Sequence, residues 1–377
     1  MDRGILLGYF AARVDLMLDF AKRLVEHESP SLDKAAIDGF ASWLAGVYGK
    51  LGAEVEVLNS RTHGNSLRIT FGAGNTQALI LCHMDTVWPV GEIERRPFRV
   101  ENGQVYGPGI YDMKAGFLYT AEVFAAFNHF RAEPQHRIVL ICNSDEEIGS
   151  PSSRELIEAE ARKSEYVLVL EPSVRGGGLK TARKGQGTYH INVEGIPAHS
   201  GSDPERGVSA VQELALHTVA LHALTDFASG ITVNVGVVKG GSRPNVVASH
   251  AEADIDVRVV DGDQMDRIDS IIRSLKPTRD GIKIEVTGGM VRPPMVRTEK
   301  TARLFQKAKE LAGDLGFELT ESSTGAGSDG NFTASVGTPT LDGLGAVGDG
   351  SHALHEHMSV GPLAQRIALL YRILTEL

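Results

Sequence analysis

Three short runs of apolar residues most constrain how this chain of 377 residues can fold. They span Ala78–Cys82, Ile138–Cys142 and Tyr166–Leu170, and stretches with helical periodicity lie between them. Because these runs are apolar along their whole length, they predict central strands that are buried on both faces, as in a parallel sheet covered by helices. We therefore expect an α/β fold with a mainly parallel mixed sheet.

The stretch from about Thr188 to Val291 has a different pattern. Its four strand candidates mix polar with apolar residues, and helical stretches follow the first and the third: Tyr189–Glu194, Ile231–Val238, Ala253–Val259 and Lys283–Val286. The order strand–helix–strand–strand–helix–strand is typical of a small α+β domain of ferredoxin-like type. We therefore expect a discontinuous catalytic domain at 1–182 and 294–377, interrupted by a smaller domain at 183–293.

Composition and charge exclude several classes of function. The chain has 38 Lys and Arg against 48 Asp and Glu, a net charge of -10, so nothing favours a nucleic acid or an anionic membrane as partner. No apolar stretch approaches the ~20 residues of a membrane-spanning helix. Cys82 and Cys142 give neither a disulfide framework nor a zinc ribbon. Residues 1–10 lack a signal cleavage site, which predicts a cytoplasmic protein.

Acidic residues and a histidine follow the carboxyl ends of all three apolar runs. His83 and Asp85 follow the first run, 145–147 (Asp-Glu-Glu) follow the second, and Glu171 follows the third. Because ligands of open α/β sheets bind outside these strand ends, we expect the side chains at one rim. Carboxylates gathered this densely are costly to bury unless a cation neutralises them. Imidazole and carboxylate without thiolate suit zinc or a similar divalent ion.

Two further segments offer ligands to the same rim. The glycine-rich stretch Gly107–Lys114 precedes a helix predicted to begin near Gly116, and it carries Asp112. The segment Ser351–His357 adds three more imidazoles. Two ions ~3.5–4 Å apart need one carboxylate that bridges them and terminal ligands for each, and the candidates are numerous enough for such a pair.

The residues at this rim resemble those of the zinc-dependent M20 metallopeptidases, and among these the glutamate carboxypeptidase-like branch. The matching strings follow the order of the family from about residue 80 onward: His83–Val87, Gly107–Lys114, Ser144–Ser150, Glu171-Pro172 and Gly195–Gly201. The resemblance implies a zinc-peptidase-like catalytic domain and a smaller domain that mediates homodimerisation.

The same resemblance implies a site for two Zn²⁺ ions per chain, with Co²⁺ or Mn²⁺ as alternatives. His83 and Glu171 would hold one ion, and Glu147 and a C-terminal histidine would hold the other. Asp112 would bridge both ions.

The C-terminal ligand has to be chosen among neighbouring histidines. The family pattern is a histidine with an acid about four residues later, which selects His352 together with Glu356. His355 lies one residue from Glu356 and fits that spacing poorly, so His352 is the preferred ligand.

Catalytic roles also follow from the resemblance. Asp85 would orient His83, and Glu146 would be the general base that moves a proton from the attacking water to the leaving amine. His199 is similar to a histidine that reaches the active site of the partner chain and stabilises the tetrahedral oxyanion.

Four further residues match family positions near the substrate. They are Asn245, Arg258, Arg292 and Gly327. Arginine can bind a carboxylate with two parallel hydrogen bonds, which suits a substrate with a free carboxyl group.

The sequence therefore predicts a dinuclear zinc hydrolase that cleaves a peptide or N-acyl amide bond next to a free carboxylate and releases a C-terminal amino acid. One alternative is an aminoacylase-like deacylase of N-acyl amino acids, which has the same chemistry. A remote alternative is a noncatalytic binding protein on the same fold. The glycines of 343–348 satisfy a dinucleotide-binding pattern, but the following residues read as a loop rather than a helix, so no nucleotide site is expected.

Overall fold

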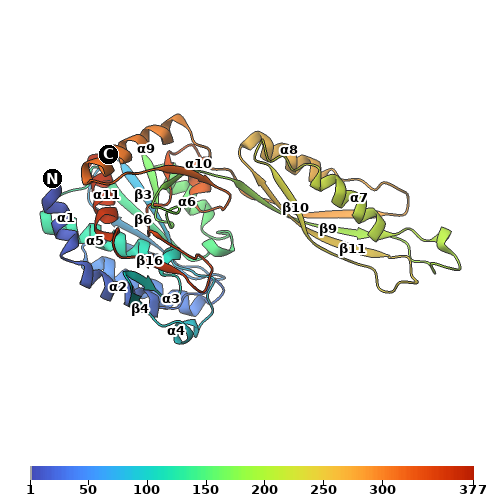
Figure 1. Ribbon diagram of the computed structural model, residues 1–377, viewed down its shortest axis with the longest axis horizontal. Coiled ribbons are helices and arrows are strands. Elements are labelled where there is room, and N and C mark those ends of the chain that lie inside the picture. The colour runs from blue at the N-terminus through green and yellow to red at the C-terminus, as the bar shows by residue number, and fades with distance from the viewer. Residues whose placement is uncertain (1) are drawn as a thin grey trace. The chain divides into compact units, whose positions relative to one another are not determined.

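The computed structural model describes residues 2–377, and it divides into two compact units (Figure 1). Unit 1 contains residues 2–182, 297–323 and 328–377, and unit 2 contains 183–296 and Thr324–Gly327. Unit 2 thus ends at residue 296 rather than at the expected 293, and it also includes Thr324–Gly327, which was expected in the larger domain. The segment Thr324–Gly327 is held by backbone carbonyls. It joins unit 2 because the N–H of Lys184 donates to the Thr324 carbonyl, and the Arg183 guanidinium donates to the carbonyls of Ala326 and Gly327.

Unit 1 is built on a six-stranded mixed sheet with the order β1-β2-β6-β3-β7-β14. Its parallel part contains β6 (Arg137–Asn143), β3 (Gln77–His83), β7 (Tyr166–Val169) and β14 (Thr340–Leu341). Two antiparallel strands complete one edge, β2 (Ser66–Phe71) and β1 (Glu54–Leu58). The predicted α/β fold with a mainly parallel mixed sheet is thus confirmed.

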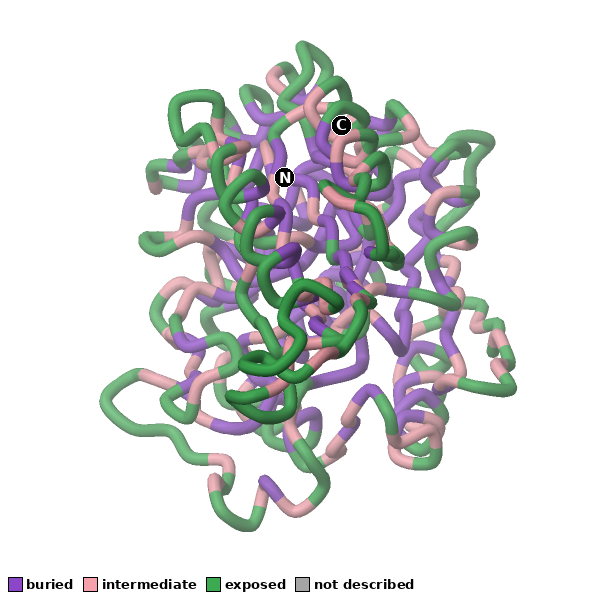
Figure 2. Tube along the Cα trace, turned by 90° about the vertical axis from the view of Figure 1, so that its right-hand side faces the viewer, coloured by how far each residue is buried: buried purple, intermediate pink, exposed green. Residues whose placement is uncertain are grey.

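Helices bury both faces of this sheet. Ala78, Ile80 and Cys82 of β3 belong to a large core with residues of several helices, whereas Leu79 and Leu81 point into a smaller core on the opposite face. Buried segments, purple in Figure 2, lie toward the inside of the fold. The helices of the large core are α1 (Arg3–Ala11), α2 (Val14–Glu26), α3 (Lys34–Lys50), α5 (Ala115–Phe130), α9 (Glu299–Leu315) and α11 (Leu363–Glu376), and those of the smaller core are α6 (Arg154–Ala161) and α10 (Gly330–Ser335).

Short elements complete unit 1. A four-stranded sheet contains β15 (Gly348–Asp349), β16 (His357–Ser359), β5 (Gln104–Tyr106) and β4 (Arg99–Glu101), and a two-stranded sheet pairs β13 (Glu321–Thr324) with β8 (Leu179–Arg183). Helix α4 (Glu92–Arg95) is a single turn. No helix within residues 2–377 is long and apolar enough to cross a membrane. The cytoplasmic location stays a prediction.

Unit 2 has the predicted order of elements. They are β9 (Gly185–Glu194), α7 (Ala210–His222), β10 (Thr232–Gly240), β11 (His250–Val259), α8 (Gly262–Arg273) and β12 (Lys283–Arg292). The strands form an antiparallel sheet with the order β10-β11-β9-β12. Tyr189, Ile191 and Val193 alternate inward along β9 and pack in a core of their own with α7 and α8.

Candidate metal centre

The carboxyl ends of the central strands carry the predicted cluster in unit 1. His83 is the last residue of β3, and Glu171 lies two residues after β7. The single helical turn Glu146–Ile148 follows β6. Asp112 lies in the turn Ile110–Lys114 that leads into α5, and His352 lies in the loop between β15 and β16. Five segments that are distant in the sequence therefore meet at one rim of the sheet.

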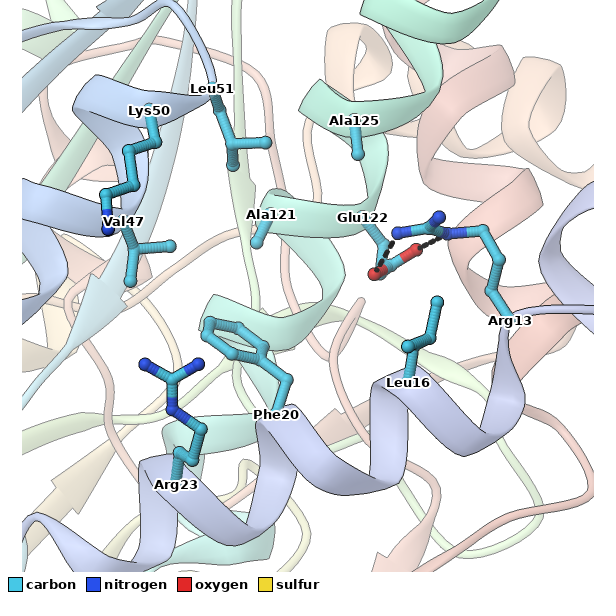
Figure 3. A pocket seen from close by; sticks show the side chains of 10 residues that line it. All are labelled: Arg13, Leu16, Phe20, Arg23, Val47, Lys50, Leu51, Ala121, Glu122 and Ala125. Carbon is cyan, nitrogen blue, oxygen red and sulfur yellow. Dashed lines mark hydrogen bonds and ion pairs between the residues drawn. The ribbon is translucent and has the colours of Figure 1, made fainter.

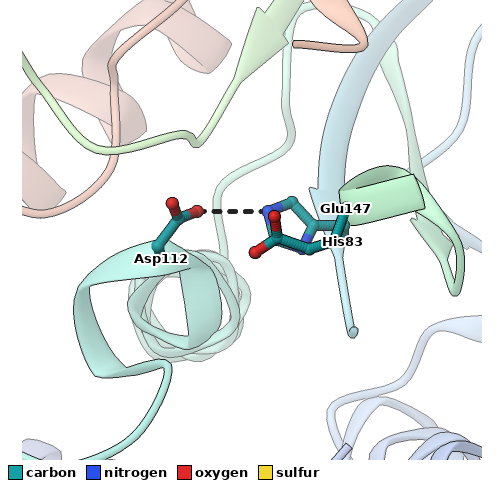
Figure 4. Close-up of side chains that lie close together, drawn as sticks. All are labelled: His83, Asp112 and Glu147. Atoms are coloured by element: carbon teal, nitrogen blue, oxygen red, sulfur yellow. Dashed lines mark hydrogen bonds and ion pairs between the residues drawn. The ribbon is translucent and has the colours of Figure 1, made fainter. Parts of the chain in front are cut away.

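Asp112 lies between two imidazoles. Its Oδ1 is 3.2 Å from Nε2 of His83, and its Oδ2 is 3.5 Å from Nε2 of His352. Figure 4 shows the first contact, with Glu147 beside the His83 ring. One carboxylate thus presents a separate oxygen to each ring, which is the arrangement that a bridging ligand requires.

The remaining acids divide between the two imidazoles. Glu147 Oε2 is 3.0 Å from Nε2 of His352, and Glu171 Oε1 is 3.5 Å from Nε2 of His83. The potential ligand atoms of His83, Asp112 and Glu147 all lie within 4.8 Å of one another, and so do those of His83, Glu146 and Glu171. The sequence-predicted ligands are therefore close enough to share ions.

The electrostatics of the cluster favour a cation. Burial alone would lower the pKa of His83, but hydrogen bonds to the carboxylates around it, foremost Asp112, raise that pKa well above its usual value. Hydrogen bonds to Asp112 and Glu147 raise the pKa of His352 to about 10. Burial opposes ionisation of Asp112, yet its two imidazole partners hold the pKa of its carboxyl far below the usual range. Positive charge therefore stabilises the ionised carboxylates of the cluster. Imidazole nitrogens and carboxylate oxygens are suitable ligands for divalent zinc.

Asp85 fixes both the His83 ring and the turn that follows β6. Its backbone carbonyl is 2.9 Å from Nδ1 of His83, which leaves Nε2 facing the carboxylates. Its buried carboxylate accepts the N–H groups of Glu146 and Glu147, both at 3.1 Å, and the hydroxyl of Ser31 at 2.7 Å. The resemblance predicted that Asp85 would orient His83, and the contact of 2.9 Å comes from its backbone carbonyl. The bonds to the Glu146–Glu147 turn and to Ser31, which lies 54 positions away, were not predicted.

Glu356 is a buried residue whose contacts sequence reasoning missed. Its carboxylate accepts backbone N–H groups of the loop that carries Asp112. The signal in the sequence is its spacing of four residues from His352, which indicates a partner of that histidine but not a contact with the Asp112 loop. His355 makes no hydrogen bond or ion pair with the cluster among the residues that the structure describes, although its carbonyl lies 2.9 Å from Nδ1 of His357.

Asp145 has a structural part in the acidic run after β6. Its carboxylate accepts the N–H and hydroxyl of Ser152 and the hydroxyl of Ser153, at 2.6–2.7 Å. These hydrogen bonds occupy the Asp145 carboxylate, and the acids of this run that lie in the cluster are Glu146 and Glu147.

Unit 2 contains His199 and Asn245, and it brings them together. An antiparallel bridge pairs His199 with Val246, and the Asn245 carbonyl accepts the N–H of Ser200 at 3.1 Å. Nδ1 of the exposed His199 accepts the N–H groups of Gly201 and Ser202, both at 3.1 Å. In the neutral form of the ring, Nδ1 is therefore the acceptor and Nε2 carries the proton.

Unit 2 also brings Arg258, Arg292 and Gly327 into one neighbourhood. In the sheet, Arg258 of β11 and Arg292 of β12 are the register partners of Gln186 in β9, one on each side of that strand. Arg258 forms two hydrogen bonds with Asp256, at 2.9 and 3.0 Å, and donates to the Gly325 carbonyl. A methyl group at Gly327 would lie 2.8 Å from Cδ of Arg292, so only glycine leaves this arginine undisturbed.

Comparisons with known proteins agree with this geometry. The sequence pattern of peptidase family M20/M25/M40 matches residues 79–376. Carboxypeptidase G2 from Pseudomonas sp. (strain RS-16) is 31% identical over 316 residues, which cover 81% of this chain and 75% of the relative. Acetylornithine deacetylase from Proteus mirabilis is 27% identical and matches 66% of each chain. The aminopeptidase PepT structure from Bacillus cereus has a TM-score of 0.79 and 23% identity, with 96% of this chain and 98% of that chain covered.

The family match extends over most of the chain and includes the segments that form the cluster. The pattern match begins within β3, just before His83, and continues through His352. The chain therefore belongs to the peptidase family M20/M25/M40.

Proposed function

We propose that this chain is a dinuclear zinc hydrolase that cleaves a peptide or N-acyl amide bond next to a free carboxylate and releases the C-terminal amino acid. It is a hydrolase of the M20 family, and its relatives include a carboxypeptidase and a deacetylase. The carboxypeptidase is the more similar relative over the greater length, which supports a carboxypeptidase activity. N-acyl-amino-acid deacylation is the second candidate.

The position of Asp112 carries the proposal, because its two oxygens lie against two separate imidazoles. His83 and Glu171 would hold one Zn²⁺, Glu147 and His352 would hold the other, and Asp112 would bridge them. Co²⁺ and Mn²⁺ are compatible with the same donors. The ions would supply a water of lowered pKa and Lewis-acid polarisation of the amide carbonyl.

Glu146 would be the general base. Its carboxylate belongs to the same compact group as His83 and Glu171, and its backbone N–H is fixed by Asp85. It takes a proton from the attacking water and passes that proton to the nitrogen of the leaving amine. Asp85 keeps the His83 ring and this turn in their places, as positioning residues do.

Residues of unit 2 would recognise the substrate. We assign Arg258, Arg292 and Asn245 to the free carboxylate and the amide of the substrate, with Gly327 leaving space beside Arg292. His199 would donate from Nε2 to the oxyanion in the active site of the partner chain, so the functional enzyme is a homodimer. The contacts of Nδ1 with Gly201 and Ser202 support this tautomer.

The variant Glu146→Gln tests the base. We expect it to lose turnover on a panel of N-acyl amino acids and C-terminal peptides while it retains two zinc ions per chain, measured by plasma mass spectrometry. Glu155→Gln, an exposed glutamate in the first turn of α6, is the matched control and should keep full activity. Unchanged turnover in the Glu146 variant would remove this residue from the mechanism.

Mixing two inactive variants tests the dimer. Chains with His199→Ala keep Glu146, and chains with Glu146→Gln keep His199. If each site combines the two residues from different chains, random exchange in a symmetric dimer restores about a quarter of the sites. No recovery of activity, or a solution mass of one chain at micromolar concentration, would contradict the shared site.

A further inference from the structure

Unit 1 contains a groove formed by residues that do not belong to the metal centre (Figure 3). Leu16 and Phe20 of α2 line one wall, Val47 and Leu51 at the end of α3 line the other, and α5 contributes to the floor. The groove has a volume of about 330 Å³. This volume lies within the range of small-molecule pockets, ~300–1,000 Å³.

The groove exists because α5 carries two alanines where longer side chains would fill the space. Ala121 and Ala125 are one helical turn apart and both line the groove. Phe20 stacks on Trp43 with ring centroids 5.6 Å apart, so its ring is held as a wall. Leu16 is 56% exposed and leaves apolar surface in contact with water. Burial of this surface by an apolar ligand would make the free energy of binding more favourable.

The charged side chains around the groove differ in whether they have a partner of opposite charge. Arg13 binds both oxygens of the buried Glu122, at 2.6 and 3.0 Å, so this pair is internally neutral. Arg23 and Lys50 lie on the other side of the groove in the view of Figure 3. Within residues 2–377 neither of them forms an ion pair with a carboxylate, and the Arg23 guanidinium lies 5.1 Å from the centroid of the Trp43 ring. Both residues are exposed, and a cationic pair without carboxylate partners beside an apolar groove attracts an anion to that edge.

We infer that this groove binds a small monocarboxylate with an apolar body, such as an arylalkanoate. The carboxylate would lie between Arg23 and Lys50, and the apolar body would cover Ala121, Ala125 and Leu16. A free amino acid is disfavoured, because the acid that lines the groove, Glu122, is engaged by Arg13 and leaves no partner for an ammonium group. The inference does not depend on the proposed function.

Titration of the zinc-loaded full-length enzyme with 3-phenylpropanoate tests this inference, with calorimetry and ligand-observed NMR as readouts. We expect saturable binding, and binding of the neutral 3-phenylpropanamide at least about tenfold weaker, since the amide loses the charge-assisted contacts. The double variant Arg23→Gln, Lys50→Gln removes the charge. Ala125→Leu fills the groove without changing the charge. Each should weaken 3-phenylpropanoate binding about tenfold or more.

Lys22→Gln is the matched control, because Lys22 is an exposed cation of α2 that does not line the groove. It should leave binding unchanged. Absence of saturable binding in the millimolar range would overturn the inference. Binding that survives both groove variants would overturn it as well, because the carboxylate would then bind elsewhere, for example at the metal centre. Equal binding of the acid and the amide would show that Arg23 and Lys50 do not recognise the ligand.

Discussion

The buried carboxylate of Glu356 accepts a hydrogen bond from the backbone N–H of Asp112, at 3.2 Å. It also accepts the N–H groups of Gly109 and Tyr111, at 2.9 and 3.0 Å, and the indole N–H of Trp88 at 2.8 Å. Glu356 lies four residues after His352 in the sequence. One side chain therefore connects the loop of the proposed bridging ligand to the turn that carries the C-terminal histidine.

Replacement of this carboxylate should weaken the metal centre. Glu356→Ala leaves buried N–H groups without an acceptor and frees the Asp112 loop, so we expect zinc affinity to fall about 10–100-fold, as for other residues that orient metal ligands. Competition with a zinc chelator measures the affinity. Trp88→Phe removes one of the four donors and should cost less. Zinc bound by the Glu356 variant as tightly as by the wild type would contradict the positioning role.

The two neighbouring histidines should differ in their effect on metal content. His352 contacts Glu147 and Asp112, whereas the His355 side chain forms no hydrogen bond or ion pair with another residue of 2–377. We expect His352→Ala to retain about one of two zinc ions after dialysis, because one ion loses an imidazole ligand. His355→Ala should retain both. Equal metal content in the two variants would contradict the choice of His352.

Much of the fold could be predicted because the spacing of apolar residues within a short segment indicates a helix or a buried strand. Helical periodicity in the sequence runs over Gly116–Phe130 and Thr301–Leu315, and the structure has α5 (Ala115–Phe130) and α9 (Glu299–Leu315) at these places. The elements that were not predicted include helix α1, strands β1 and β2, and several much shorter elements. Helix α10 has six residues and β14 has two, so tertiary packing rather than sequence pattern defines them.

The site could be predicted only in part, for a related reason. Ligand types and strand ends indicated which residues meet, and the resemblance to a family supplied their expected roles. The supporting contacts join residues far apart in the chain, such as Ser31 with Asp85 and Glu356 with Gly109. The distance in space between the members of such a pair depends on how the loops between strands and helices fold. The number of residues between them in the sequence therefore does not predict the contact.

The hydrogen bonds of Asp85 lead to a prediction about catalysis. In Asp85→Asn an amide nitrogen replaces one acceptor oxygen, so one N–H of the Glu146–Glu147 turn loses its partner. We expect kcat to fall about 10–100-fold, with a smaller change in KM, because the base is displaced while substrate contacts remain. Ser31→Ala removes a single bond to the same carboxylate and should have a smaller effect. Equal kcat for the Asp85 variant and the wild type would contradict this role.

Lys114 should make the stability of unit 1 depend on pH. It is 1% exposed, its Nζ donates to the His27 carbonyl at 2.6 Å, and burial lowers its pKa from 10.5 to about 8. Between these two pKa values the unfolded chain binds a proton that the folded chain does not, so this residue makes the free energy of unfolding rise with pH.

Lys114→Met should abolish that contribution. We expect the stability of the wild type relative to the variant to increase by about 2 kcal/mol from pH 7 to pH 10. Urea unfolding followed by tryptophan fluorescence measures it, because both tryptophans, Trp43 and Trp88, lie in unit 1. Lys34→Met, at a partly exposed lysine at the start of α3, is the control and should leave the pH dependence unchanged. Parallel pH profiles for the wild type and the Lys114 variant would mean that the buried amine keeps its proton up to the pKa of the unfolded chain, which its burial should prevent.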